Sequence, residues 1–278
     1  MNYRHAFHAG NASDCMKHAL LVWIMDALLR KPAPVFVLDT HAGLGTYDLL
    51  AGPATRTGEW QGGIGRLLQD PPPALQDFTA LVGRLGLYPG SPALVRAMMR
   101  ERDRLVCCEL HPDDCAVLRR WASHAGQVGV HLRDGYAALG ALLPPRGAQG
   151  GPFTRGLVLI DPPYEAPGEF ERVQAGLITA AGRWPQGVLA AWYPIKHLSP
   201  VTTFHEGLHL SGLSDVVVAE LHWRAPTDPQ RLNGCGLVVR NAPFGFMDAA
   251  RPVLDALLTR LGNHEPGAGT ACWRLTNE

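Results

Sequence analysis

The chain has 278 residues, enough for one large domain or two modest ones with a sizeable buried core. Its formal net charge is zero, so nothing in the overall charge predicts a nucleic-acid-binding protein, and such a surface would have to be a local patch. The longest apolar run is interrupted by Asp26 and is too short to span a bilayer, and the first residues contain no apolar signal-peptide core. These patterns favour a cytoplasmic protein without a membrane partner.

An amphipathic helix is predicted first, over residues 11–30, with Ser13 as its N-cap. Asp14 and His18 are four residues apart and therefore share one face of this helix. His18 is compatible both with a core histidine beside Asp14 and with a residue of a site.

Seven short apolar runs follow as strand candidates. They begin at Val35, Leu105, Val128, Gly156, Gly187, Val216 and Gly236. The first four are continuous rather than alternating, which is typical of buried parallel strands. Helical patterns separate the strands, so we predict a doubly wound, mostly parallel, seven-stranded α/β sheet in a single domain over residues 1–278.

Each of the first four predicted strands ends in or near an acidic residue: Asp39, Glu109, Asp134 and Asp161. Ligands bind beyond the carboxyl ends of the strands in such sheets, so the four acids indicate a site. The alternative is that each acid caps the helix that follows it.

The stretch "LDTHAGLGTY" (38–47) follows the first strand. Gly43 and Gly45 would allow close approach of the backbone to a ligand, and we expect a helix after them whose N-terminus favours an anion. The full G-x-G-x-x-G fingerprint is absent, so dinucleotide binding is weakly supported.

The next two acids suit a nucleoside. Glu109 could accept hydrogen bonds from ribose hydroxyls, and Asp134 could accept one from an adenine amino group. Gly135 would let the adenine ring approach.

Seventy residues separate Asp39 from Glu109, whereas about 20 separate the glycine loop from the second-strand acid in a nucleotide-binding βαβ unit. Loops this long are usually functional. We therefore expect a small helical insertion subdomain over the active face, at approximately residues 46–104.

The fourth strand runs into "DPPY" (161–164). An exocyclic nucleobase amine is a poor nucleophile because its lone pair is delocalised into the ring, and two hydrogen-bond acceptors on its N–H groups would activate it. Asp161 and the carbonyl of Pro162 could be those acceptors, held by rigid prolines, while Tyr164 could stack on a flipped-out base. The alternative is a Pro-Pro turn with Tyr164 packed in the core.

These motifs resemble a known family. "YRHAFHAGNASDCMKH", "LDTHAGLGTY", "YPGSP", "ELHP" and "LIDPPYE" occur here in the order found in the bacterial 23S ribosomal RNA adenine-N6-methyltransferases, which are class I, S-adenosylmethionine-dependent enzymes of the DPPY type. The match covers nearly the whole chain and weakens after about Lys196. It implies a Rossmann-like methyltransferase fold with S-adenosyl-L-methionine as cofactor and no metal. It also implies that the enzyme acts on 23S rRNA, either protein-free or in an early assembly particle. Nothing in the sequence resembles a coiled coil, and we expect a monomer.

The resemblance also implies roles for individual residues. The implied catalytic residues are Asp161, Pro162 and Tyr164; the implied cofactor-binding residues are His18, His41, Gly43, Ser91, Glu109, Asp134, Gly135 and Asp161; the implied substrate-binding residues are Tyr3, His5 and Lys17. Ser91 stands before a proline and is also a good N-cap, and Tyr3 and His5 could belong to a frayed terminus.

Three alternatives remain. A metal-dependent phosphohydrolase could use the His/Asp set His5, His8, Asp14, His18, Asp39 and His41, but it leaves "DPPY" and Glu109 unexplained. A non-enzymatic RNA-binding or cofactor-sensing module would have no need of Asp161. A methyltransferase could instead act on a DNA adenine or a protein amide. The arginines at 224, 231 and 240 suit either RNA phosphate contact or a solvated surface.

The six cysteines contain no CxxC pair, which argues against a zinc ribbon or a disulfide framework. Cys107 and Cys108 are adjacent in a predicted strand, so their side chains should point to opposite faces of the sheet.

Overall fold

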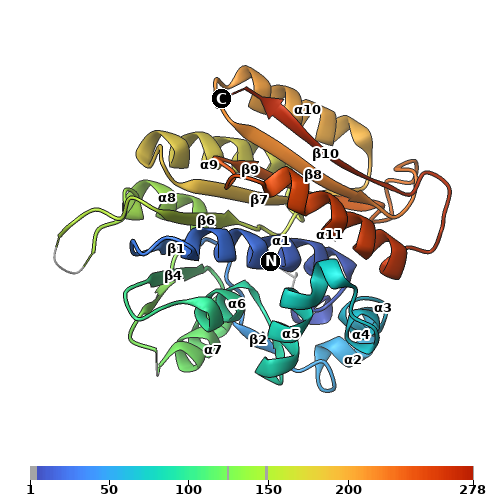
Figure 1. Ribbon diagram of the computed structural model, residues 1–278, viewed down its shortest axis with the longest axis horizontal. Coiled ribbons are helices and arrows are strands. Elements are labelled where there is room, and N and C mark those ends of the chain that lie inside the picture. The colour runs from blue at the N-terminus through green and yellow to red at the C-terminus, as the bar shows by residue number, and fades with distance from the viewer. Residues whose placement is uncertain (1–4, 124, 148–149, 278) are drawn as a thin grey trace.

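The computed structural model describes residues 5–123, 125–147 and 150–277. Its centre is an eight-stranded sheet with the strand order β10-β8-β9-β7-β6-β1-β4-β5 (Figure 1). The strands are β1 (Phe36–Asp39), β4 (Arg104–Glu109), β5 (Val128–Leu132), β6 (Gly156–Ile160), β7 (Val188–Ile195), β8 (Val216–His222), β9 (Gly234–Arg240) and β10 (Gly269–Thr276). Strands β5, β4, β1, β6 and β7 run parallel to one another, and the pairs β7–β9, β9–β8 and β8–β10 are antiparallel. The predicted doubly wound α/β sheet is confirmed.

The prediction of seven strands was one strand short. The missing strand is β10, which pairs with β8 at the edge of the sheet. All eight of its residues are partly or fully exposed, and the longest apolar run in its sequence "GTACWRLT" is only three residues, 271–273. An edge strand of this kind lacks the pattern by which buried strands are identified.

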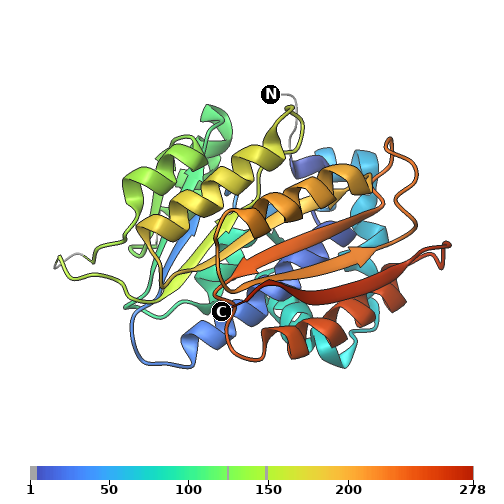
Figure 2. The ribbon, with the colours of Figure 1, turned by 90° about the horizontal axis from the view of Figure 1, so that it is seen from above.

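Helices cover both faces of the sheet (Figure 2). On one face lie α1 (Ala12–Leu29), α5 (Gln76–Leu85), α6 (Ser91–Met98) and α11 (Phe246–Leu261), and on the other lie α8 (Gly135–Leu142), α9 (Glu169–Arg183) and α10 (Leu198–Leu210). Helix α7 (Pro112–Ala122) packs on β4 and β5. Cys107 belongs to the core on the first face and Cys108 to the core on the second, as the alternation along a strand predicted. All six cysteines are free thiols.

The N-cap of helix α1 lies two residues before the predicted one. Its N-cap is Asn11, whose side-chain oxygen accepts a hydrogen bond from the backbone N–H of Asp14 at 3.0 Å. The prediction of Ser13 as the N-cap was wrong, because Ser13 lies inside the first turn. Asn and Ser are about equally good caps, so the residue types alone did not decide between them.

The chain between β1 and β4 differs from the expected course. No helix begins directly at the glycine loop; the chain instead forms β2 (Thr46–Tyr47), which pairs with β3 (Tyr88–Pro89). Gly43 and Gly45 have φ angles of 61° and 85°, which a right-handed helix does not allow. Between β2 and β3 lie α2 (Pro53–Thr57), α3 (Glu59–Gly62), α4 (Ile64–Gln69), η2 (Pro73–Leu75) and α5. The predicted helix N-terminus for an anion is therefore absent from this loop.

Within the part of the chain that the structure describes, none of the helices combines the length and the apolar character that a membrane crossing requires.

Candidate active site

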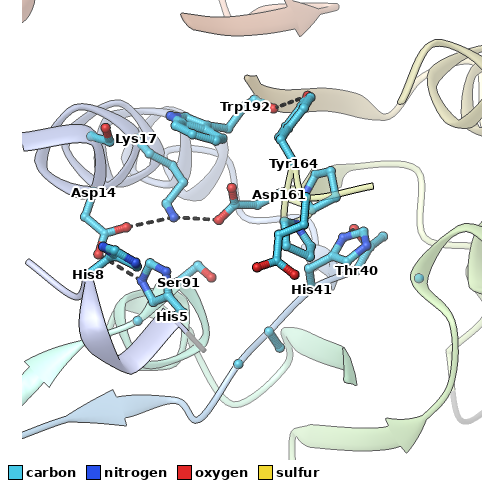
Figure 3. A pocket seen from close by; sticks show the side chains of 18 of the residues that line it. His5, His8, Asp14, Lys17, Thr40, His41, Ser91, Asp161, Tyr164 and Trp192 are labelled. Carbon is cyan, nitrogen blue, oxygen red and sulfur yellow. Dashed lines mark hydrogen bonds and ion pairs between the residues drawn. The ribbon is translucent and has the colours of Figure 1, made fainter. Parts of the chain in front are cut away.

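A cavity of about 990 Å³ opens at the carboxyl ends of β1, β4 and β6 (Figure 3). This is the place where the strand order reverses, since the chain leaves β1 toward β4 and later returns to the other side of β1 as β6. Among the sequence-predicted site residues, those that line it are His5, Lys17, His18, His41, Gly43, Ser91, Glu109, Asp134, Gly135, Asp161, Pro162 and Tyr164. The remaining one, Tyr3, lies outside the described residues.

The first strand-end acid, Asp39, is fully buried. Ser91 Oγ donates a hydrogen bond to its Oδ2 at 2.6 Å, and the backbone N–H of His41 donates to its Oδ1 at 3.3 Å. Burial raises the pKa of Asp39 to about 6, against the opposing effect of the Ser91 hydrogen bond. Asp39 thus ties the start of α6 to the end of β1, while Ser91 also faces the cavity.

The second acid, Glu109, braces the glycine loop. It accepts hydrogen bonds from the backbone N–H of Gly43 at 3.0 Å and of His111 at 2.8 Å. Burial raises its pKa, although both of these hydrogen bonds act in the opposite direction. The carboxylate therefore fixes two loops at the edge of the cavity, with lone pairs left for a ligand.

The third acid, Asp134, is the N-cap of α8 and accepts a hydrogen bond from the N–H of Ala137 at 2.8 Å. Arg172 donates to its other oxygen at 3.2 Å. A Cβ on Gly135 would lie 2.3 Å from the carbonyl oxygen of Thr40. The close approach of the Thr40 main chain therefore requires a glycine at position 135. The sequence alone suggested a different reason for this glycine, namely room for a ligand ring.

Capping explains only one of the four acids. Asp39 precedes a turn, the helix after Glu109 has His111 at its N-cap, and the helix after Asp161 has Gly168 at its N-cap. The capping alternative is therefore correct for Asp134 alone, and the other three carboxylates need another account.

Asp161 is part of a buried chain of charges (Figure 3). Lys17 Nζ lies 2.5 Å from Asp161 Oδ2 and 2.9 Å from Asp14 Oδ1, and His5 Nε2 lies 2.9 Å from Asp14 Oδ2. The Lys17 side chain is only 6% exposed. Burial by itself would lower the pKa of Lys17, but the carboxylates of Asp14 and Asp161 outweigh this and raise it. Lys17 is therefore a fixed cation one side chain away from the "DPPY" carboxylate.

Asp14 is the other anion of this chain. Burial would raise its pKa, but His5 and Lys17 hold it well below the usual range. In the sequence analysis Asp14 belongs only to the metal-binding alternative and not to the methyltransferase site, although its spacing of three residues from Lys17 indicates a shared helix face. The contact between Lys17 and Asp161 spans 144 residues and has no local signal in the sequence.

Tyr164 both packs in the core and lines the cavity. Its hydroxyl donates a hydrogen bond to the carbonyl oxygen of Trp192 at 2.9 Å. Its ring meets Trp192 edge-on, with the centroids 5.9 Å apart, and also contacts Phe170. Trp192 lines the cavity too and was missed by the sequence argument. The hydrogen bond and the aromatic contacts fix the plane of a ring that borders the cavity.

Two histidines border the cavity, of which His18 is buried and His41 is partly buried. His18 is 1% exposed, and its Nδ1 lies 2.9 Å from the hydroxyl of Tyr88. Burial lowers the pKa of His18 to about 3 and that of His41 to about 4. Both rings are therefore neutral at pH 7 and can act as hydrogen-bond donors or acceptors.

The His/Asp set considered for a metal is divided among separate partners. His5 meets Asp14, His8 meets Glu59, and His18 meets Tyr88. Over residues 5–123, 125–147 and 150–277, no group of three or more His, Cys, Asp or Glu side chains is arranged to hold a metal ion.

The arginines of the last strands are largely engaged within the fold. Arg224 pairs with Glu265 at 2.7 Å, and Arg240 donates to the carbonyl of Pro185 at 2.9 Å. Arg231 is half exposed and lies 3.7 Å from Glu265.

Comparison with known proteins adds the family. A family model described as "Ribosomal RNA large subunit methyltransferase D, RlmJ" matches residues 32–275. The chain is 35% identical over 281 residues to "Ribosomal RNA large subunit methyltransferase J" of Escherichia coli strain K12, and 33% identical over 282 residues to the protein of the same name from Haemophilus influenzae. Each alignment covers 98% of both chains. A crystal structure of a protein from Legionella pneumophila is 30% identical, with a TM-score of 0.86 over 96% of this chain and 98% of that one.

Proposed function

The chain belongs to the ribosomal RNA large subunit methyltransferase D (RlmJ) family, and we propose that it methylates the exocyclic N6 amine of an adenine in 23S rRNA, with S-adenosyl-L-methionine as the methyl donor. The observation that carries this proposal is the convergence of "DPPY", Glu109 and Asp134 on one cavity at the strand ends of a methyltransferase-family chain.

The residues present fit the cofactor. The cavity volume of about 990 Å³ accommodates a nucleoside together with a nucleobase. Glu109 would hold the ribose, and Asp134 would accept a hydrogen bond from the adenine amino group. Ser91, His18 and His41 would complete the wall, the two imidazoles in their neutral form. When bound, S-adenosyl-L-methionine supplies an electrophilic methyl group on a sulfonium.

Asp161 would act on the target amine. Its Oδ2 is held by Lys17, so its second oxygen is the one left to accept a hydrogen bond from an amine N–H. With the Pro162 carbonyl as a second acceptor, the amine is drawn toward tetrahedral geometry, and the positive charge that develops on nitrogen is dispersed. The ion pair with Lys17 orients the Asp161 carboxylate. Asp161 need not be a strong base, because the amine proton leaves only as or after the methyl group arrives.

The target base would stack on Tyr164, whose plane is fixed by its bond to Trp192. His5 would lie at the substrate side, together with Tyr3. The resemblance implies that Lys17 binds RNA; since its charge is buried between two carboxylates, we propose that it orients Asp161 instead. The inserted segment, residues 46–104, would form a helical subdomain beside this end of the cavity.

The test is methyl transfer from labelled S-adenosylmethionine to protein-free 23S rRNA from a strain that lacks the gene, followed by digestion to nucleosides. We expect the label in N6-methyladenosine. Label in another nucleoside would refute the assigned target amine. RNA without label, from protein that still binds the cofactor, would move the proposal to another methyl acceptor, such as an assembly particle.

A further inference from the structure

An N-terminal arm, residues 5–11, borders the cavity and is held by a residue that the sequence argument did not consider. The arm consists of η1 (His5–Phe7) and the turn that leads into α1. Glu59, the first residue of α3, contacts it twice: Oε1 lies 2.8 Å from His8 Nδ1, and Oε2 accepts a hydrogen bond from Asn11 Nδ2 at 3.0 Å. Glu59, His8 and Asn11 all line the cavity.

Backbone contacts also hold the arm against the segment that contains Glu59. The N–H of Ile64 donates to the carbonyl of Gly10 at 2.9 Å. A Cβ on Gly63 would lie 2.1 Å from that carbonyl oxygen, so a side chain at position 63 would push the arm away. Thr57 Oγ1 also donates to the carbonyl of Phe7. The arm therefore rests directly on α2, α3 and α4.

The arm is also connected to the "DPPY" carboxylate. His5 and the N–H of Gly10 both bond to Asp14 Oδ2, and Asp14 shares Lys17 with Asp161. A displacement of the arm would remove two of the hydrogen bonds that hold Asp14 in place. The position of the arm and the position of Asp161 are thus coupled through Asp14 and Lys17.

We propose that Glu59 is a positioning residue for methyl transfer: it clamps the arm so that His5 and the Asp14–Lys17–Asp161 chain stay in place for the substrate base. This inference rests on the proposed function. Because Glu59 acts through the arm, its effect belongs to the RNA side of the reaction and leaves cofactor binding unchanged.

The charges of the clamp agree with this role. Burial would raise the pKa of Glu59, but the hydrogen bonds from His8 and Asn11 outweigh this and lower it. The hydrogen bond to Glu59 raises the pKa of His8 in turn. Both side chains are 38% exposed, which screens the ion pair, so the loss of both hydrogen bonds of Glu59 should change activity by about tenfold rather than abolish it.

The experiment compares Glu59→Ala, Glu59→Gln, His8→Ala and the double variant His8→Ala/Glu59→Ala with wild type. Glu206→Ala, an exposed glutamate of α10 outside the cavity, is the matched control. For each protein kcat and KM for 23S rRNA, the Kd for S-adenosylmethionine and amide hydrogen exchange are measured. The informative amides are Gly10 and Asn11, whose N–H groups bond to Asp14 and to the His8 carbonyl.

We expect Glu59→Ala to lower kcat/KM for RNA about tenfold and to speed the exchange of both amides at least tenfold, with the cofactor Kd within twofold of wild type. Glu59→Gln keeps an acceptor and should recover to within about threefold. The double variant should be little worse than Glu59→Ala, because both single changes break the same bond.

Wild-type kinetics and exchange in Glu59→Ala would overturn the inference, as would a parallel loss of cofactor affinity or the absence of rescue by glutamine. If Glu59→Ala does not fold, His8→Ala decides instead: it removes the contact with Glu59 Oε1 and should lower kcat/KM for RNA and speed the exchange of both amides, and wild-type kinetics and exchange in it would overturn the inference. A wild-type protein that does not methylate RNA would defeat the proposed function instead, and the exchange comparison would then judge the clamp on its own.

Discussion

Replacement of Asp161 by asparagine tests the proposed chemistry most directly, because it keeps the shape of the side chain and removes its charge. Lys17 Nζ lies 2.5 Å from Asp161 Oδ2, so an asparagine must turn its carbonyl oxygen toward this cation. Its NH₂ group then takes the place of the second oxygen. The target amine would meet a donor where the wild type presents an acceptor.

The magnitude follows from this exchange of groups. Loss of one preorganised hydrogen-bond partner at a reacting centre costs about 10²–10³ in kcat, or about 2.7–4 kcal/mol. We expect the upper end, because a donor replaces the acceptor. Stability should fall by much less than the ~3–5 kcal/mol of a broken buried ion pair, since Lys17 keeps Asp14 at 2.9 Å.

The assay is single-turnover transfer of labelled methyl groups to 23S rRNA, with cofactor affinity measured by calorimetry. Cofactor Kd should weaken by less than about tenfold, because Glu109 and Asp134 are unchanged. The matched control is Glu171→Gln, which removes the charge of an exposed glutamate on α9. A transfer rate within threefold of wild type in Asp161→Asn would refute the acceptor mechanism.

Three further predictions concern the walls of the cavity. Tyr164→Phe loses only the hydrogen bond to the Trp192 carbonyl and should change KM for RNA by less than about threefold, whereas Tyr164→Ala should lose about 1–3 kcal/mol of stacking energy with the target base. Equal effects of the two variants in steady-state kinetics would argue against stacking. Ser91→Ala removes the hydroxyl that donates a hydrogen bond to Asp39, and it should lower the free energy of unfolding by about 1–3 kcal/mol at pH 8. The loss should be smaller at pH 5, because the pKa of Asp39 is raised to about 6 and the hydroxyl donor is needed only by the ionised carboxylate; urea titrations at both pH values measure this. Burial lowers the pKa of His18 to about 3, so the stability that depends on its neutral form is present above the unfolded pKa near 6.5 and is lost as the pH falls toward 3. Between pH 7 and pH 5 this linkage should cost the wild type about 2 kcal/mol of unfolding free energy, and His18→Asn should remove that cost; identical stability–pH profiles for the two proteins would contradict this.

Several features of the site were predictable because they depend on short stretches of chain. Asp39, Glu109 and Asp161 each end a continuous apolar run, and parallel strands bring their carboxyl ends to one edge of the sheet. The glycine loop was recognised for the same reason. Its continuation was not, because two positive φ angles and the Tyr47 hydroxyl, which accepts from the N–H of Leu44, turn the chain into β2 instead of a helix.

The partners of these residues could not be predicted in this way. Glu59 holds His8 and Asn11 across about fifty residues, and Ser91 meets Asp39 across a similar distance. Such pairs produce no periodic pattern in the sequence, because the residues around Glu59 are the same whichever distant side chain it contacts. Gly135 is a related case. Its position next to Asp134 suggested space for a ligand, whereas the contact that requires glycine is with the Thr40 main chain, which only the tertiary structure reveals.

The sequence by itself determined the class of fold, the edge of the sheet that carries the site and the chemical types gathered there, because burial patterns and strand-end residues are local properties. The tertiary structure decided that Lys17 is a buried counter-ion of Asp161, that Glu59 clamps the N-terminal arm, and that β10 completes the sheet. Those outcomes depend on which distant segments come into contact when the core packs. No short stretch of the chain determines these contacts, because they follow from the free energy of the whole fold.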